Sequence, residues 1–170
     1  MGAPPYEPLV RRATPQDHAE LVRLATRALD HIGSHRGGAA FLDREARNRP
    51  VDASVTADLD AAATGATVVL LGCLGDVPVG YAVARSEPTA SGTLTVVDEL
   101  YVEPEARSVG VGSALMEALL DAARRHGSRG IQAEALPGDR ATKNFFEGFG
   151  LVARKITVHR SLDEGTPAGA

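Results

Sequence analysis

The sequence has no tryptophan, a single cysteine and only 4% aromatic residues. One thiol excludes an intrachain disulfide. The position of Cys73 within the apolar stretch VVLLGCLG is typical of a small core residue rather than a nucleophile. No block of basic residues is present, because 18 lysines and arginines face 22 acidic residues, for a net charge of -4. This balance argues against a nucleic-acid partner.

Long hydrophobic runs are also missing. No apolar stretch approaches the roughly 20 residues of a membrane helix, and the N-terminus lacks a basic segment followed by an apolar one. We therefore expect a cytoplasmic protein with no membrane partner. The length of 170 residues, 44% of them apolar, fits one domain with one core. We assign this domain to residues 1–161 and expect the polar tail, 162–170, to be disordered.

The N-terminal third predicts one strand and one clear helix. Residues 9–13 are extended, and Thr14 and Pro15 then supply a helix N-cap and a proline suited to the first helical position. This helix should run from about residue 15 to 30 and end before HIGSHRGGAAF. Its expected core residues are Ala19, Leu21, Val22, Leu24, Ala25 and Leu29. Ser54 would cap a second, short helix over VTADLDAAAT.

Three consecutive strands are predicted next. The β-rich runs TVVLLGCLG and VPVGYAVARSE are joined by Gly75 and Asp76, which is typical of an antiparallel hairpin. A second turn at PTASG leads into TLTVVDELYVEP, the third strand. The sheet should therefore be antiparallel in this part.

The C-terminal third alternates helices and strands. The helix in SVGVGSALMEALLDAARRHG should end at Gly127, with an exposed pair between Asp121 and Arg125. Its sheet-facing stripe is Val111, Leu115, Ala118, Leu119 and Ala122. We expect a strand over GIQAEAL, a short helix over 140–149 and a last strand over LVARKITVHRSL. A strand, a helix and a parallel strand make one βαβ unit, so the sheet must be mixed.

The turn that opens this long helix contains Arg107, Gly110 and Gly112. A helix N-terminus presents N–H groups and positive dipole ends, so a phosphate can bind there, and glycines permit its close approach. Alternatively, the glycines only allow tight packing of strand and helix. Two known phosphate loops do not fit, because no Gly-Lys-Ser/Thr follows and Leu115 stands where a dinucleotide fingerprint has its third glycine.

The stretch DELYVEPEARSVGVGSALM resembles the signature of the GNAT acyltransferase superfamily, in which Arg or Gln, two residues, Gly, any residue and Gly or Ala follow in order. A second block, AEALPGDRATKNFFEGFGLV, is similar to the family's closing motif. The resemblance covers roughly residues 68–158. It implies an α+β fold with a mixed, mostly antiparallel sheet of six to seven strands, two of them parallel and splayed, flanked by about four helices.

The resemblance also implies acetyl-CoA as cofactor and a small-molecule or peptide amine as acceptor, in a protein that can be a homodimer. The pantetheine arm would lie along the strand ending in LYV, and the turn would cradle the phosphates. The cofactor-binding residues would then be Leu100, Tyr101, Val102, Arg107, Ser108, Val109, Gly110, Val111, Gly112, Ser113, Asp139, Asn144 and Phe146. Asp139 stands where the family commonly has asparagine.

Transfer to an amine requires a base that removes a proton from the ammonium group. The candidates are Glu134, which we prefer, Asp98 and Glu99; strand alternation would place the last two on opposite faces. Phe146 occupies the position where many family members have a tyrosine acid, so a non-catalytic acyl-CoA-binding or sensing module is the alternative to an N-acetyltransferase.

Two histidines near the end of the first helix, His31 and His35, are spaced like metal ligands. Gly33 lies between them and no acidic or cysteine partner is near in sequence, so we expect no metal. Arg36 could meet an anionic group of the acceptor, although a solvated turn is the favoured interpretation.

Overall fold

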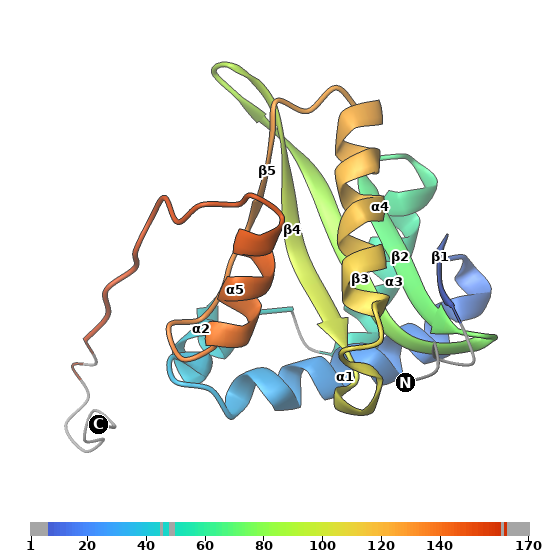
Figure 1. The fold of residues 1–170 in the computed structure, drawn as a ribbon, viewed down its shortest axis with the longest axis horizontal. Helices are drawn as coiled ribbons and strands as arrows, with labels where there is room; N and C mark the ends of the chain where they lie inside the picture. Colours follow the sequence, from blue (N-terminus) through green and yellow to red (C-terminus); the bar gives the residue numbers. More distant parts are fainter. Residues whose placement is uncertain (1–6, 45, 48–49, 161, 163–170) are drawn as a thin grey trace.

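A computed structural model describes all residues except 1–6, 45, 48–49, 161 and 163–170. Within this part of the chain, α-helices and β-strands alternate in an order typical of an α+β domain (Figure 1). In chain order they are β1 (Pro8–Arg12), α1 (His18–Gly33), α2 (Gly38–Arg44), α3 (Val51–Ala63), β2 (Thr67–Leu74), β3 (Val77–Thr89), β4 (Gly92–Val102), α4 (Val111–Arg125), β5 (Gly130–Ala133) and α5 (Arg140–Gly148). Short 3-10 turns at Pro15–Asp17 and Pro104–Ala106 precede α1 and follow β4.

The described strands form one sheet in the order β1-β2-β3-β4-β5. Neighbours are antiparallel from β1 to β4, and β4 and β5 are parallel, so the sheet is mixed as predicted. The two hairpins are also confirmed, with Gly75 at positive φ in the first turn. The expected strand over GIQAEAL is shorter than predicted and ends at Ala133.

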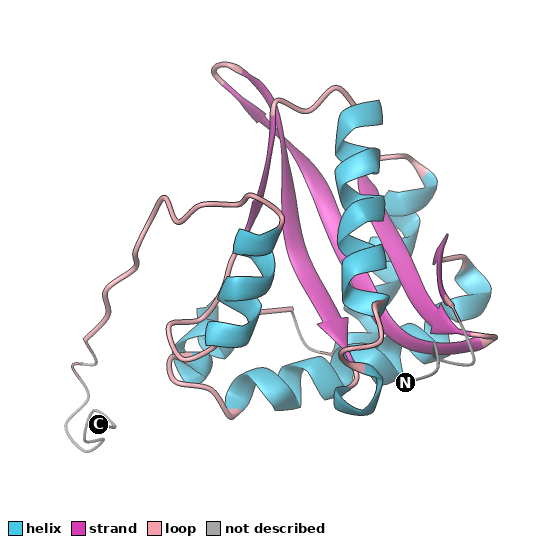
Figure 2. Ribbon diagram, in the orientation of Figure 1, coloured by secondary structure: helices cyan, strands magenta, loops and turns pink. Residues whose placement is uncertain are grey.

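Helices cover both faces of the sheet (Figure 2). On one face α1 and α3 pack against β2 and β3, around a core that includes Leu24, Leu71 and Tyr81. On the other face α4 crosses the sheet over a core that includes Leu115 and Phe146. No helix in the described part of the chain has both the length and the apolar character needed to span a bilayer.

The predicted helices occur with shifted ends. The first continues to Gly33, and Ala19 is exposed rather than buried. The helix expected to start at Ser54 begins at Val51, with Pro50 as its N-cap, because the fixed φ of proline suits that position. Five α-helices are present among the described residues instead of about four, since the chain resumes a helix at Gly38.

The long helix α4 follows the prediction in part: Val111, Leu115 and Leu119 of the expected stripe are buried, whereas Ala118 and Ala122 are only half-buried. Its buried residues are Val111, Leu115, Met116, Leu119 and Ala123. Gly127 terminates it at φ 75°, a conformation that suits glycine. The expected pair between Asp121 and Arg125 is wrong, because the Asp121 carboxylate accepts from Arg124, 2.8 Å away.

The last predicted strand, residues 151–162, is absent from the sheet. Residues 151–160 have no regular secondary structure and pair with no described strand, and Val152 to Arg160 are exposed. The alternation of apolar and polar residues favours a strand, but a strand also needs an edge to pair with, and this segment leads away from the sheet (Figure 1). The described sheet therefore has five strands rather than six or seven. The tail predicted to be disordered lies outside the described residues, apart from Leu162.

Candidate active site

The parallel strands β4 and β5 stop pairing about halfway along β4. They pair at four positions, of which the last joins Val97 to Ala133. Beyond that point, residues 98–102 have no strand partner on this side among the described residues. A backbone edge with open N–H and C=O groups can accept an extended ligand as if it were another strand.

The turn between β4 and α4 ends in left-handed backbone. Ser108 has φ 66° and Gly110, the N-cap of α4, has φ 95°. The first helical bond runs from the Ala114 N–H to the Gly110 carbonyl, 2.9 Å away, so the N–H groups of residues 111–113 precede the helical ladder. No acidic residue lies in this first turn to neutralise the dipole. The helix therefore presents the positive end that the sequence predicts.

The two glycines of the turn differ in what the protein's own backbone and packing demand. Gly110 adopts a φ that strains any residue with a Cβ. At Gly112 a Cβ would lie 3.6 Å from the Phe145 ring and 3.7 Å from Val102 Cγ2, which are ordinary contacts. Packing within the chain thus does not require glycine at position 112, and the space it leaves is available to a ligand.

Arg107 is held in place by contacts within the chain. Its Nε donates to the Val102 carbonyl at 3.0 Å, and its guanidinium carbon lies 5.9 Å from the centroid of the Tyr101 ring. The other end of the guanidinium is 3.3 Å from His31 Nε2. Burial, followed by the charge of Arg107, lowers the pKa of His31 below its ordinary value. The cation is therefore held at the end of β4, beside the N-terminus of α4.

A buried carboxylate that the sequence analysis missed fixes the end of β4. Glu103 is 8% exposed and accepts hydrogen bonds from Arg23, at 2.5 Å, and from Arg27. Both arginines lie one turn apart on α1, and Arg23 also donates to the Pro78 carbonyl. The spacing of the arginines was visible in the sequence, but their partner lies 80 residues away from Arg23. This cluster attaches the start of the turn between β4 and α4 to α1.

Both acidic residues of β4 interact with side chains of β3. Asp98 forms an ion pair with Arg85, and Glu99 accepts from Tyr81. Tyr81 and Arg85 are four residues apart on β3 and so share a face of the sheet, which means that both carboxylates turn to that face. The expectation of opposite faces is wrong, because a β-bulge opposite Val83 interrupts the alternation here.

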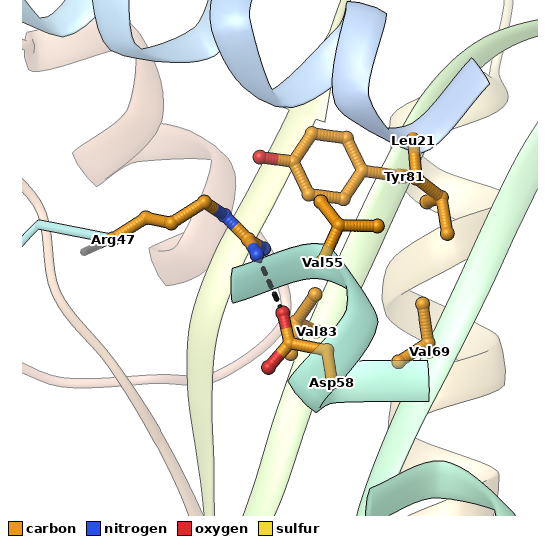
Figure 3. Close-up of a pocket in the computed structure, with 7 residues that line it drawn as sticks. All are labelled: Leu21, Arg47, Val55, Asp58, Val69, Tyr81 and Val83. Carbon is orange, nitrogen blue, oxygen red and sulfur yellow. Dashed lines mark hydrogen bonds and ion pairs between the residues drawn. The ribbon is translucent and has the colours of Figure 1, made fainter. Parts of the chain in front are cut away.

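Glu99 belongs to a charge network centred on Arg47, whose bond to Asp58 is drawn in Figure 3. Arg47 Nε and Nη2 bind the two oxygens of Glu99 at 2.9 and 2.8 Å, and Nη1 reaches Asp58 at 2.6 Å and Ser54 at 3.1 Å. Burial raises the pKa of Asp58, although the charge of Arg47 opposes that rise. Burial together with the nearby Glu99 carboxylate raises the pKa of the Tyr81 hydroxyl well above its ordinary value.

The cavity beside this network is small. It measures about 10 Å³ and is lined by Arg47, Asp58, Tyr81 and four apolar side chains, so it has room for about one water molecule (Figure 3). A larger hollow of about 260 Å³ lies at the other end of α4, next to Arg125 and His126, far from the turn that opens the helix. Neither is lined by the residues expected to bind a cofactor.

Glu134 directly follows β5 and is exposed. Since Ala133 pairs with Val97, the register places Glu134 level with Asp98, where the two strands begin to separate. Of the three candidate bases, Glu134 thus lies at the mouth of the gap on the β5 side.

The residues in and next to α5 that were expected to bind the cofactor lie in different surroundings. Asp139 caps the helix, accepting from the Thr142 N–H at 2.9 Å and its hydroxyl at 2.6 Å. Desolvation would raise the pKa of Asp139, but these bonds, with His35 and His31, lower it. Phe146 is buried in the core and Asn144 is exposed.

The end of α1 meets the loop before α5. The rings of His31 and His35 stack edge to face with centroids 4.6 Å apart, and a Cβ on Gly138 would come within 2.9 Å of Arg36 Cβ. Arg36 is exposed. Among the described residues, no group of three or more histidine, cysteine and acidic side chains could hold a metal ion.

Comparison with known proteins gives a clear family match. The family model described as "Acetyltransferase (GNAT) family" matches residues 39–151. No curated protein matches the sequence.

Many solved structures share the fold. A tetramutant of the BH1408 protein from Bacillus halodurans superposes with a TM-score of 0.74 at 20% identity, over 91% of this chain and 99% of that one. A predicted acetyltransferase from Clostridium acetobutylicum, solved with acetyl-CoA, gives 0.69 at 16%, over 91% and 96%. AAC(6')-Iy, in complex with the bisubstrate analogue CoA-S-monomethyl-acetylneamine, gives 0.69 at 15%, over 91% and 98%. At identities this low, the likeness shows the fold.

Proposed function

The chain belongs to the acetyltransferase (GNAT) family, and from this premise we propose that it transfers the acetyl group of acetyl-CoA to a primary amine by direct attack in a ternary complex. The observation that carries the proposal is the open N-terminus of α4 beside an edge of β4 that has no strand partner in the described part of the chain. The N-terminus of α4 suits an anion, and the open edge of β4 suits an extended chain. A nucleotide joined to pantetheine has both parts, so it would need these two surfaces side by side.

Two parts of the chain would hold the cofactor. The N–H groups within Arg107–Ser113 would bind the pyrophosphate, with space at Gly112, and the backbone edge of Leu100–Val102 would bind the amides of the arm. When bound, acetyl-CoA supplies a thioester carbonyl that an amine can attack. The acetyl-CoA and CoA-analogue complexes of two proteins with this fold support the assignment.

The residues of α5 would contribute unequally. Asp139 is occupied as the helix cap, and Phe146 lies in the core, so their expected contacts with the cofactor are weakened. Phe145, which lies against Gly112, is better placed to border the bound phosphates or arm. Asn144 is exposed and free of such packing restraints.

Glu134 would act as the general base. Glu134 stands where β4 and β5 separate, which is where an amine would approach a thioester lying between the strands. An ionised carboxylate there can accept the proton that the ammonium group must lose.

Phe146 supports a second candidate function. Its ring is buried and has no proton to give to the departing thiolate. If no other group or water supplied this proton, the protein would bind acyl-CoA without turning it over, as a sensing module. Thiolates leave readily near neutral pH, so we favour catalysis.

Calorimetry and a thiol-release assay test the proposal together. We expect acetyl-CoA to bind, and free thiol to appear when one class in a panel of aminoglycosides, polyamines, amino acids and peptides is added. Binding without release on any amine would favour the sensing module. Absence of binding would overturn both functions.

A further inference from the structure

One imidazole near the end of α1 reaches the turn that opens α4. His31 Nε2 lies 3.3 Å from Arg107 Nη2, although the two residues are 76 positions apart in the sequence. The centroid of the His31 ring is 6.2 Å from that of Tyr101 and 4.6 Å from that of His35. The imidazole thus has aromatic neighbours on β4 and on its own helix, while one of its nitrogens contacts the guanidinium.

The chemistry of this contact defines the state of the imidazole. An arginine side chain only donates hydrogen bonds, so His31 Nε2 must accept and cannot carry a proton. Burial, followed by the charges of Arg107 and His35, lowers the pKa of His31, which favours the same neutral state. The Asp139 carboxylate opposes this shift. His31 is therefore an acceptor for Arg107 rather than a second cation beside it.

The contact also limits where the guanidinium can lie. Among the described residues, the hydrogen-bond partners of the Arg107 side chain are the Val102 carbonyl, 3.0 Å from Nε, and His31. A long side chain held at one point keeps much of its rotamer freedom, whereas a second point fixes the orientation of the planar group. The N–H groups that neither partner uses remain available to a ligand.

We propose that His31 is a positioning residue for the cofactor, which holds the Arg107 guanidinium between the open edge of β4 and the N-terminus of α4, ready to donate to a phosphate of acetyl-CoA. This role rests on the proposed function, because it requires that acetyl-CoA bind at this turn. A guanidinium that is already ordered loses less freedom when a phosphate binds, so the phosphate is bound more tightly. Helix α1 then contributes to cofactor affinity through a side chain that acts on Arg107.

Two substitutions separate the acceptor from the ring. His31→Phe keeps a ring beside Tyr101 and His35 but has no acceptor; it should weaken acetyl-CoA binding about two- to tenfold in calorimetry, because Arg107 must then be ordered on binding. His31→Gln has a carbonyl that can accept from Arg107, so its affinity should stay within about twofold of the unmodified protein. His126→Phe, at an exposed position beyond the other end of α4, is the control and should bind normally. No weakening by His31→Phe, or equal weakening by His31→Gln, would overturn the proposal.

A double-mutant cycle tests whether His31 acts through Arg107. Arg107→Met keeps an unbranched side chain without the donors. In that background His31→Phe should cause no further loss of affinity for acetyl-CoA, because the group that it positions is gone. The same loss in both backgrounds would show that His31 acts independently of Arg107, and the positioning role would be refuted.

Nitrogen-15 NMR of the histidine rings in the unmodified protein, without ligand, needs no variant that folds. Near neutral pH the His31 ring should carry its proton on Nδ1 and none on Nε2, and Arg107→Met should weaken this preference. A proton on Nε2 would refute the contact on which the positioning role depends. If acetyl-CoA did not bind the unmodified protein at all, the proposed function would fail instead, whatever the state of His31.

Discussion

Replacing Arg47 by methionine should destabilise the protein far more than a comparable change at the surface. The Arg47 side chain is 5% exposed and makes four hydrogen bonds, to Glu99, Asp58 and Ser54. Methionine keeps much of the aliphatic volume but removes the charge. Two carboxylates would then face each other near Tyr81 without a cation between them.

The size of the stability loss depends on how far solvent can reach the two carboxylates that lose Arg47. Removing one member of a buried ion pair costs about 3–5 kcal/mol, because the other charge stays buried and unpaired. Glu99 and Asp58 are 21% and 30% exposed, so water can solvate them in part. We therefore expect a loss of about 2–3 kcal/mol in the free energy of unfolding of Arg47→Met.

Equilibrium unfolding in urea measures this loss, with Arg85→Met as the matched control. Arg85 also pairs with two carboxylates, Asp98 and Glu87, but its side chain is 44% exposed, and such surface pairs contribute about 0–1 kcal/mol. If the two variants lost equal stability, the network around Arg47 would not be the buried restraint described above.

The pH dependence of the stability of Arg47→Met gives an independent check, because this change should alter the pKa of Asp58. Burial raises the pKa of Asp58 and Arg47 opposes this rise, so Arg47→Met should raise it further. A folded-state pKa above the unfolded one means that the folded protein binds the proton more tightly, and stability is gained as pH falls through that pKa. The deficit of Arg47→Met should therefore shrink when unfolding is measured at pH 5 rather than at about pH 7.

Three further changes test other parts of the molecule. Gly112→Glu should weaken acetyl-CoA binding by about tenfold or more in calorimetry without loss of thermal stability, since a carboxylate there suits the helix but competes with phosphate. Gly112→Ala fills part of the same space without adding a charge, so it should weaken binding less than Gly112→Glu does. Equal affinities of the two variants for acetyl-CoA would contradict a phosphate site at this turn. Glu134→Gln should slow thiol release by about 10²–10⁴-fold while leaving the affinity for acetyl-CoA unchanged. Glu117→Gln, at an exposed position on α4, is the control. An unchanged rate of thiol release would show that Glu134 is not the base. Asp17→Asn should lower stability by about 1–2 kcal/mol at pH 7 in urea unfolding, because the Asp17 carboxylate accepts from Arg11 and from the N–H and hydroxyl of Thr14. The hydrogen bond from Arg11 holds the pKa of Asp17 well below 3.8, so this contribution is present above that pH and fades as the pH falls below it. A loss of stability independent of pH would contradict this prediction.

Local sequence signals predicted most of the fold. Apolar periodicity placed the three consecutive strands and α4, and glycines marked the hairpin turn at Gly75, the turn that opens α4 at Gly110 and the end of α4 at Gly127; all three have positive φ. These features depend on residues within a few positions of one another. The same is true of the turn that opens α4, whose spacing also carries the family resemblance.

Contacts between distant residues could not be predicted from such signals. Arg47 and Glu99 are 52 residues apart, and Arg23 and Glu103 are 80 apart, so no local pattern relates them. The fate of residues 151–160 could not be read from their alternation either, because pairing depends on which edge the segment can reach. The prediction of opposite faces for Asp98 and Glu99 failed for a related reason, since a bulge is created by the register of two strands.

That bulge also explains where the gap between β4 and β5 begins. Val83 is aligned with Glu99 and Ala84 with Val97, which leaves Asp98 as an extra residue in β4. A bulge bends its strand and increases the local twist. Val97 is also the last residue of β4 that pairs with β5, so the bend and the end of pairing occur at the same level. The gap therefore follows from one inserted residue and should exist before any ligand binds.

Hydrogen exchange can test this origin of the gap. Amides of residues 98–102 that point away from β3 should exchange rapidly in the free protein and become protected when acetyl-CoA is added. Amides of residues 94–97 that pair with β5 should be protected in both states, because their partners are protein groups. Slow exchange along the whole of β4 in the free protein would show that the edge is already covered, and the pantetheine arm would have to bind elsewhere.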